Sequence, residues 1–204
     1  MTRVRVKICG IRDESTLRAA VEAGADAVGF VVAAPSSPRC LEIGRAAALM
    51  ALAGVHATAV AVTRHPEPAQ MARLFAAAEP ACVQTDLADF AAMDLPPGWQ
   101  GLPVLRGRAD ARALGHEWTT VLCEGADSGR GEVGDWQFAA EMARERRVVL
   151  AGGLDADNVG SAIRAVRPFA VDVSSGVESA PGIKDIAAIK AFIAAVRQAE
   201  NEVV

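Results

Sequence analysis

Short apolar runs recur along the chain, and a segment with helical periodicity follows each of them. The runs are rich in Val, Ile and Ala and end in small or polar residues, a pattern typical of parallel strands buried on both faces. The predicted strands cover residues 4–9, 27–32, 58–62, 81–84, 103–106, 119–124, 148–150 and 171–173. The predicted helices cover residues 14–23, 43–53, 67–78, 87–93, 109–115, 136–145, 156–166 and 186–198.

Alternation of this kind indicates an α/β protein with a parallel sheet. The eight strand–helix pairs are spaced about 25 residues apart, and eight such units close into a (β/α)8 TIM barrel. A doubly wound open sheet is the rival architecture, but it usually has fewer units and a G-x-G-x-x-G motif after the first strand, which is absent here. No linker divides the chain, so we expect residues 1–204 to form one domain.

Composition narrows the classes of function. The net charge of -4 argues against general binding of nucleic acid or anionic membranes, so we expect neither as a partner. No apolar run is long enough to span a bilayer, and the first residues are too polar for a secretory leader. The four cysteines and three histidines show no metal-binding spacing. These features predict a reduced cytoplasmic protein without a structural metal. The sequence leaves open whether it is a monomer or a homodimer.

Two glycine-rich turns point to a small phosphorylated ligand. Ala-Gly-Gly at 151–153 follows the seventh predicted strand, and Ser-Ser-Gly at 174–176 follows the eighth. Glycine lets backbone N–H groups approach an anion closely, and the phosphate site of many (β/α)8 barrels is built by the loops after strands 7 and 8. Gly152, Gly153, Ser175 and Gly176 are therefore the predicted phosphate ligands. The alternative is that both are ordinary turns that need glycine for their geometry.

Reactive groups of such barrels lie at the carboxyl ends of the strands. Cys9 ends the first strand, and a cation on the same side, Lys7, would favour a thiolate that can act as a base. A free cysteine is also a common buried filler, so position alone leaves both readings open. Asp172 on the eighth strand is expected to pair with Lys7 inside the barrel.

Two further side chains complete the candidate chemistry. Glu124 ends the sixth strand and is a candidate general acid, with Asp127 in the following loop as a competitor. Arg39, in a Pro/Ser loop, is suited to hold a carboxylate with its two-pronged guanidinium. The alternative readings are a solvated carboxylate for Glu124 and a surface cation for Arg39. Lys184 is expected to be solvated.

Together these residues resemble the phosphoribosylanthranilate isomerase family of tryptophan biosynthesis. The resemblance spans the chain and is most specific at Lys-Ile-Cys-Gly and in the last quarter. The similar segments are residues 6–11, 24–30 with 37–39, 150–154, Asn158, 164–168, 171–178 and 181–184.

The resemblance implies an Amadori rearrangement of N-(5-phosphoribosyl)anthranilate, with no redox cofactor or metal. It implies that Cys9 is the general base and that the acid is the carboxyl group ending strand 6, here Glu124. Arg39 would hold the anthranilate carboxylate. The backbone at Gly152-Gly153 and Ser175-Gly176 would hold the phosphate.

The chain departs from the family pattern at three places. Glu124 stands where the family has Asp, Asp86 stands where it has His, and the turn after strand 3 lacks the usual Gly-Val-Phe. The departures at Glu124 and Asp86 keep open a catalytically weak barrel that only binds a phosphorylated ligand. A separate alternative is a dual isomerase of the histidine and tryptophan pathways, although similar barrels use an Asp at the end of strand 1, where this chain has Cys9. The Gly-rich loop 125–134 is a candidate lid.

Overall fold

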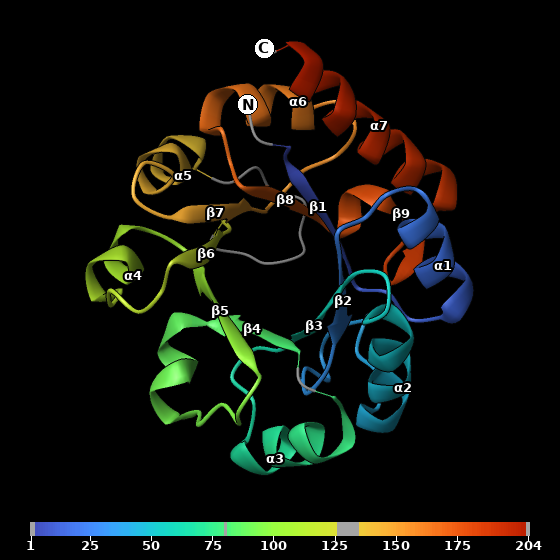
Figure 1. Ribbon diagram of the computed structural model, residues 1–204, viewed down its shortest axis with the longest axis vertical. Coiled ribbons are helices and arrows are strands. Elements are labelled where there is room, and N and C mark those ends of the chain that lie inside the picture. Colours follow the sequence, from blue (N-terminus) through green and yellow to red (C-terminus); the bar gives the residue numbers. More distant parts are fainter. Residues whose placement is uncertain (1–2, 80, 126–134, 203–204) are drawn as a thin grey trace.

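Eight parallel strands close into a barrel, and helices surround it (Figure 1). The computed structural model describes residues 3–79, 81–125 and 135–202. Neighbouring strands pair in chain order, and β1 closes the barrel by pairing with both β2 and β8. The strands are β1 (Arg5–Cys9), β2 (Ala27–Val31), β3 (Thr58–Val62), β4 (Cys82–Asp86), β5 (Gln100–Leu105), β6 (Thr120–Cys123), β7 (Arg147–Leu150) and β8 (Ala170–Val173). The predicted (β/α)8 barrel is confirmed.

Helices follow the strands as the periodicity predicts, apart from one that is a 3₁₀ helix. The α-helices are α1 (Glu14–Glu22), α2 (Ile43–Ala53), α3 (Pro68–Ala77), α4 (Arg108–Ala113), α5 (Trp136–Met142), α6 (Val159–Val166) and α7 (Ile186–Glu202). The segment predicted over 87–93 is the 3₁₀ helix η1 (Leu87–Ala92). Helix α6 begins three residues later than predicted, because Asp155 accepts hydrogen bonds from the N–H groups of Asp157 and Asn158 and forms a turn there.

A short hairpin after β8 was not predicted. The 3₁₀ helix η2 (Ser175–Val177) leads into β9 (Glu178–Ala180), which pairs antiparallel with β10 (Ile183–Lys184). The hairpin is too short to show an alternating apolar pattern, which is the signal that identifies strands in a sequence. It matters for function because its two ends carry Glu178 and Lys184.

Side chains of each strand alternate between the outer core and the barrel interior, as strand geometry requires. Val6 and Ile8 of β1 pack outward in the main hydrophobic core under the helices. A smaller apolar cluster fills the barrel interior; it consists of Leu102, Val104, Leu122, Val149, Ala151 and Ala170. Lys7 and Cys9 have the opposite parity to Val6 and Ile8, which places them on the inner side.

Lys7 and Asp172 form the predicted ion pair inside the barrel. The two residues are register partners on β1 and β8, and Lys7 Nζ lies 2.9 Å from Asp172 Oδ2. Their side chains are only 4% and 7% exposed. Burial alone would lower the pKa of Lys7, but the neighbouring Asp172 and Cys9 raise it above its ordinary value. Lys7 is therefore a fixed positive charge next to Cys9.

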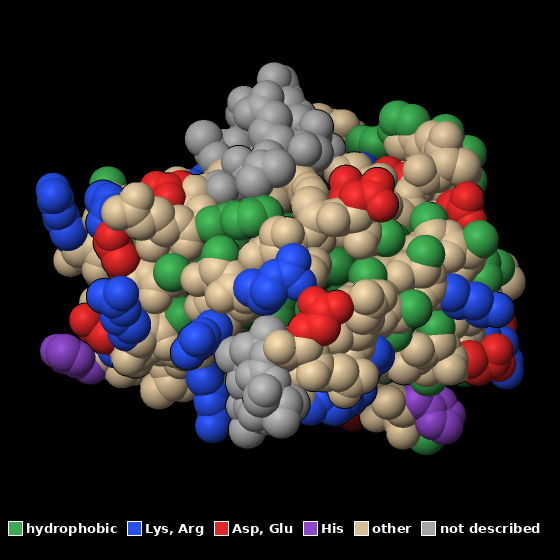
Figure 2. All heavy atoms as spheres, turned by 90° about the horizontal axis from the view of Figure 1, so that it is seen from above, with side chains coloured by type: hydrophobic (Ala, Val, Ile, Leu, Met, Phe, Trp, Pro, Cys, Tyr) green, Lys and Arg blue, Asp and Glu red, His purple; other side chains and the backbone are tan. Residues whose placement is uncertain are grey.

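Charged side chains of both signs are interspersed on the side face drawn in Figure 2, with no broad basic area among the described residues there. An anionic ligand therefore needs a local site, as the net charge suggested. Among the described residues, no helix combines the length and apolar character needed to cross a membrane.

Candidate active site

An open pocket of about 1170 Å³ lies at the carboxyl ends of the barrel strands. This is the end of a (β/α)8 barrel at which reactive groups gather. The pocket is lined by candidate residues from the β1 end, the β2–α2 loop, the β6 end and the β8 turn; they are Cys9, Arg39, Glu124 and Ser175. Of the predicted side-chain candidates within the described residues, the fold brings every one to this pocket.

Cys9 lines the pocket and is 7% exposed. Gly29 on β2 is its register partner, and a methyl group there would lie 2.9 Å from Cys9 Sγ and 3.2 Å from Lys7 Nζ. A side chain at position 29 would therefore displace the thiol or the ammonium group. The glycine in the second strand makes room for both.

The protonation of Cys9 differs from the expectation based on Lys7 alone. Burial raises the pKa of the thiol, and the positive charges of Lys7 and Lys184 offset this only in part, while Asp172 raises it further. The pKa of Cys9 in the ligand-free pocket therefore lies above its ordinary value.

Arg39 is held by a protein carboxylate. Its Nε and Nη2 donate to the two oxygens of Glu178 at 2.8 and 2.7 Å. Lys184 Nζ also donates to Glu178 at 2.7 Å, and the Gly182 N–H donates at 3.2 Å. Burial alone would raise the pKa of Glu178, but these donors lower it to about 2. Glu178 is therefore ionised at neutral pH, and it fixes the orientation of the Arg39 guanidinium group.

This arrangement leaves one edge of Arg39 for a ligand. Glu178 occupies Nε and Nη2, and among the described residues no acceptor is found for Nη1. A substrate carboxylate can therefore meet Nη1 without breaking the pair with Glu178.

The expectation that Lys184 is solvated was wrong. Its side chain is 2% exposed, and its ammonium group donates to Glu178 and to the Ser174 carbonyl oxygen. The unpredicted hairpin brings Lys184 inward, and burial lowers its pKa more than Glu178 raises it. Ser174 in turn donates its hydroxyl to the Cys9 carbonyl at 3.2 Å, which connects the hairpin to the end of β1.

The two glycine turns meet in space. Gly152 and Gly153 have positive φ values of 90° and 62°, which glycine adopts without strain. A methyl group at Gly176 would lie 2.0 Å from the Leu154 carbonyl oxygen, so the β8 turn packs directly on the β7 turn. Among the described residues, the N–H groups of Gly152, Gly153, Ser175 and Gly176 have no acceptor. Unpaired N–H groups on adjoining turns are suited to bind an anion.

Glu124 faces Arg106, which the sequence places at a strand end as a second candidate guanidinium but without a specific role. Arg106 Nη1 lies 3.3 Å from Glu124 Oε2, and Nε and Nη2 lie 2.9 and 2.6 Å from Asp86 Oδ1. Asp86 is the last residue of β4, and Arg106 and Glu124 directly follow the neighbouring strands β5 and β6. Their positions at strand ends were visible in the sequence, but the contacts among them were not. The competing acid Asp127 and the candidate lid lie in the segment 126–134, outside the described residues.

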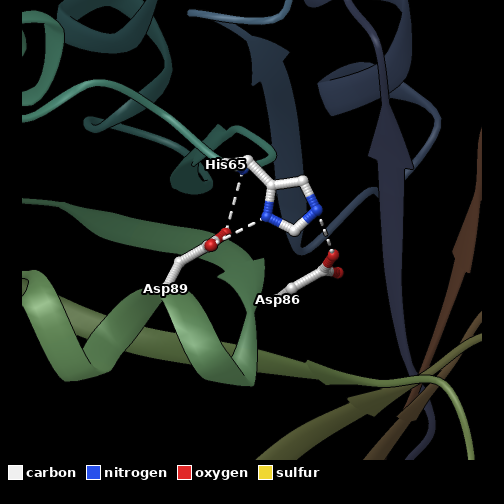
Figure 3. A group of neighbouring side chains, drawn as sticks. All are labelled: His65, Asp86 and Asp89. Atoms are coloured by element: carbon white, nitrogen blue, oxygen red, sulfur yellow. Dashed lines mark hydrogen bonds and ion pairs between the residues drawn. The ribbon is translucent and has the colours of Figure 1, made fainter.

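Asp86 also borders a cluster with His65 and Asp89 (Figure 3). His65 Nδ1 lies 2.9 Å from Asp89 Oδ1, and His65 Nε2 lies 3.5 Å from Asp86 Oδ2. These ligand types suit a divalent cation. However, Asp86 already pairs with Arg106 and lies 3.4 Å from Arg64 Nε, and both guanidinium groups would repel a metal ion. We therefore assign no metal to this cluster.

The fold and the pocket define a class. This (β/α)8 barrel belongs among the barrel enzymes that act on phosphorylated small molecules, because it places a thiol, a carboxyl group, an arginine and two turns suited to bind an anion around one pocket. Comparison with known proteins gives the family. The model of the N-(5′-phosphoribosyl)anthranilate isomerase family matches residues 6–195, and the chain belongs to that family.

Individual relatives agree with this assignment. The chain is 39% identical to N-(5′-phosphoribosyl)anthranilate isomerase of Pseudomonas putida (strain W619), over 98% of this chain and 100% of the relative. It is 40% identical to that of Haloferax volcanii, over 98% and 96%. The crystal structure of the Thermotoga maritima enzyme has a TM-score of 0.80 and 34% identity, over 96% of this chain and 99% of that chain.

Proposed function

We propose that the chain catalyses the Amadori rearrangement of N-(5′-phosphoribosyl)anthranilate, with Cys9 as general base and Glu124 as general acid. The observation that supports this most strongly is the pocket itself, which places Cys9, Glu124 and Arg39 around one cavity in a member of this isomerase family. A structure of the same family in complex with reduced 1-(o-carboxyphenylamino)-1-deoxyribulose 5-phosphate has a TM-score of 0.79 to this chain.

The first step opens the ribose ring. Glu124, in its protonated form, gives its proton to the ring oxygen as the C1–O bond breaks. The lone pair of the anthranilate nitrogen forms the C1=N bond, so an iminium ion results. The acid must lie within hydrogen-bond reach of the ring oxygen, and the end of β6 offers such a place on the pocket wall.

The second step moves the double bond. The Cys9 thiolate removes the proton from C2, the C2–H electron pair forms the C1=C2 bond, and the iminium electrons return to nitrogen. The enol then loses its hydroxyl proton and C1 gains one, which gives the ketone. Burial raises the pKa of Cys9 in the free pocket, and the positive iminium beside it lowers this pKa again, so the thiol gives its own proton to water in the open pocket before it takes the proton from C2.

Binding uses the remaining polar groups. We assign the substrate carboxylate to Nη1 of Arg39. We assign the phosphate to the N–H groups of Gly152, Gly153, Ser175 and Gly176, which have no acceptor among the described residues. We further propose that residues 1–204 act as one domain, as a cytoplasmic enzyme without cofactor. It is a monomer or a homodimer; one Thermotoga maritima relative is described as dimeric.

Activity on freshly prepared N-(5′-phosphoribosyl)anthranilate tests the proposal, followed by the loss of anthranilate fluorescence. Cys9→Ala and Glu124→Gln are each expected to lower kcat by about 10² to 10⁴-fold, the usual contribution of one general acid or base. Circular dichroism of both variants should match the wild type. Normal turnover by Cys9→Ala would remove the assigned base.

The same experiment separates the alternatives. Binding of the reduced product analogue by the wild-type protein, without turnover, would indicate a barrel that only binds a phosphorylated ligand. Turnover of the related histidine-pathway aminoaldose as well would indicate a dual isomerase.

A further inference from the structure

Asp86 and Glu124 meet through one side chain, that of Arg106. Arg106 contacts Glu124 through Nη1 and Asp86 through Nε and Nη2. All three side chains are between 14% and 17% exposed, so these charges interact with little screening by water. The group is therefore a coupled network at the edge of the pocket.

The contacts of Arg106 with these two carboxylates are unequal. Both N–H groups on one edge of its guanidinium converge on Asp86 Oδ1, at 2.9 and 2.6 Å, while the contact to Glu124 is a single one at 3.3 Å. A shorter, doubly bonded contact is the stronger one. Of these two carboxylates, Asp86 therefore holds the guanidinium more strongly, and Nη1, which contacts Glu124, also donates to the Gly125 carbonyl oxygen at 3.3 Å.

We propose that Asp86 and Arg106 are positioning residues for Glu124: Asp86 retains the guanidinium of Arg106, so that Arg106 orients the Glu124 carboxyl without forming a full two-pronged ion pair with it. A full pair would hold Glu124 as a carboxylate, which has no proton to donate. This inference rests on the proposed function, because it gives a reason for the network only if Glu124 is the acid.

Other charges around the network come from several elements. Asp86 Oδ2 faces Arg64 and His65 of the β3–α3 loop, at 3.4 and 3.5 Å. Asp110 on α4 accepts from the backbone N–H of Arg106 and leaves its guanidinium untouched. The charged or titratable groups of the described residues that complete the pocket wall are Cys9, Arg39, Glu67, Asp172 and Glu178.

The proposal predicts opposite effects for two substitutions. In Asp86→Asn, Arg106 is released to pair with Glu124 and a neighbouring negative charge disappears, and both changes favour the ionised carboxyl. In Arg106→Gln, the cation is lost, which favours the protonated carboxyl. We expect the titration midpoint of the Glu124 carboxyl to move down by about one pH unit in the first variant and up by about one unit in the second.

Nuclear magnetic resonance of protein labelled with ¹³C at the glutamate carboxyl measures these midpoints, and Glu124→Gln identifies the signal by its loss. Arg106→Lys keeps the charge and is expected to stay close to the wild-type midpoint. Arg108→Gln is the matched control, because Arg108 pairs with exposed Glu141 outside the pocket. In this variant the titration midpoint of Glu124 should stay at its wild-type value. If Arg106→Gln does not fold, Asp86→Asn still tests the sign, because its midpoint should move down while that of Arg106→Lys stays close to the wild type.

Movement of the midpoint in the same direction in both variants, or in neither, overturns the positioning role. Turnover separates this failure from a failure of the proposed function. Wild-type turnover by Glu124→Gln would remove the acid assignment on which the inference rests. Loss of turnover in Glu124→Gln together with unmoved midpoints would overturn the positioning alone.

Discussion

Replacing Asp172 by Asn is expected to cause a large loss of stability. The substitution keeps the size of the side chain and removes the only charge that the structure pairs with Lys7 within the described residues. The ammonium group would remain inside the barrel, where its side chain is 4% exposed. Leaving one partner of a buried pair uncompensated costs about 3–5 kcal/mol. For a chain of this size, that corresponds to a fall of about 6–20 °C in the unfolding midpoint.

Urea unfolding followed by circular dichroism gives the free energy of unfolding, and a second variant tests the reason for its change. In Lys7→Met/Asp172→Leu both charges are gone, so most of the lost stability should return, because no buried ion remains. Glu14→Gln is the control: Glu14 and Arg18 form an exposed i,i+4 pair, and the midpoint should not change measurably. A change below about 1 kcal/mol in Asp172→Asn would refute the reasoning, as would a double variant no more stable than the single one.

Three further outcomes follow from the site. The pKa of Glu178 is lowered from 4.5 to about 2, so its carboxylate stabilises the fold above pH 4.5, and this contribution is lost as the pH falls from about 4.5 to about 2. The free energy of unfolding should therefore depend less on pH over that range in Glu178→Gln than in the wild type, and identical curves would contradict the pairing. Because burial raises the pKa of Cys9, its inactivation by iodoacetamide should accelerate continuously from pH 7 to about 9, and a rate that levels off below pH 8 would show an ionised thiol instead. In Gly176→Ala, the added methyl group meets the Leu154 carbonyl oxygen and forces the two turns apart. The KM for substrate and the inhibition constant of inorganic phosphate should therefore both rise by about tenfold or more. Unchanged inhibition by phosphate would place the phosphate site elsewhere.

The regular alternation of strand and helix was enough to predict the barrel, because each of the eight units carries its own periodic signal. The same parity argument placed Lys7 and Asp172 on the inner side, and closure of β8 on β1 then made them register partners. The glycine turns were visible for a similar reason, since backbone requirements are local. Cys9 and Glu124 were singled out at strand ends and Arg39 in the loop after the second strand, and the fold brings all three to one pocket.

What the sequence left open depends on contacts between residues far apart in the chain. Arg39 was expected to meet a substrate carboxylate, but whether a protein carboxylate already held it depended on Glu178, which lies 139 residues away. Lys184 was expected to be solvated because the hairpin that buries it is too short to show a pattern. The protonation of Cys9 depended on a balance between burial and neighbouring charges, which no local pattern contains. Local signals therefore determined the barrel and the candidate residues, and tertiary structure decided their partners and charges, because those arise only when distant strand ends meet.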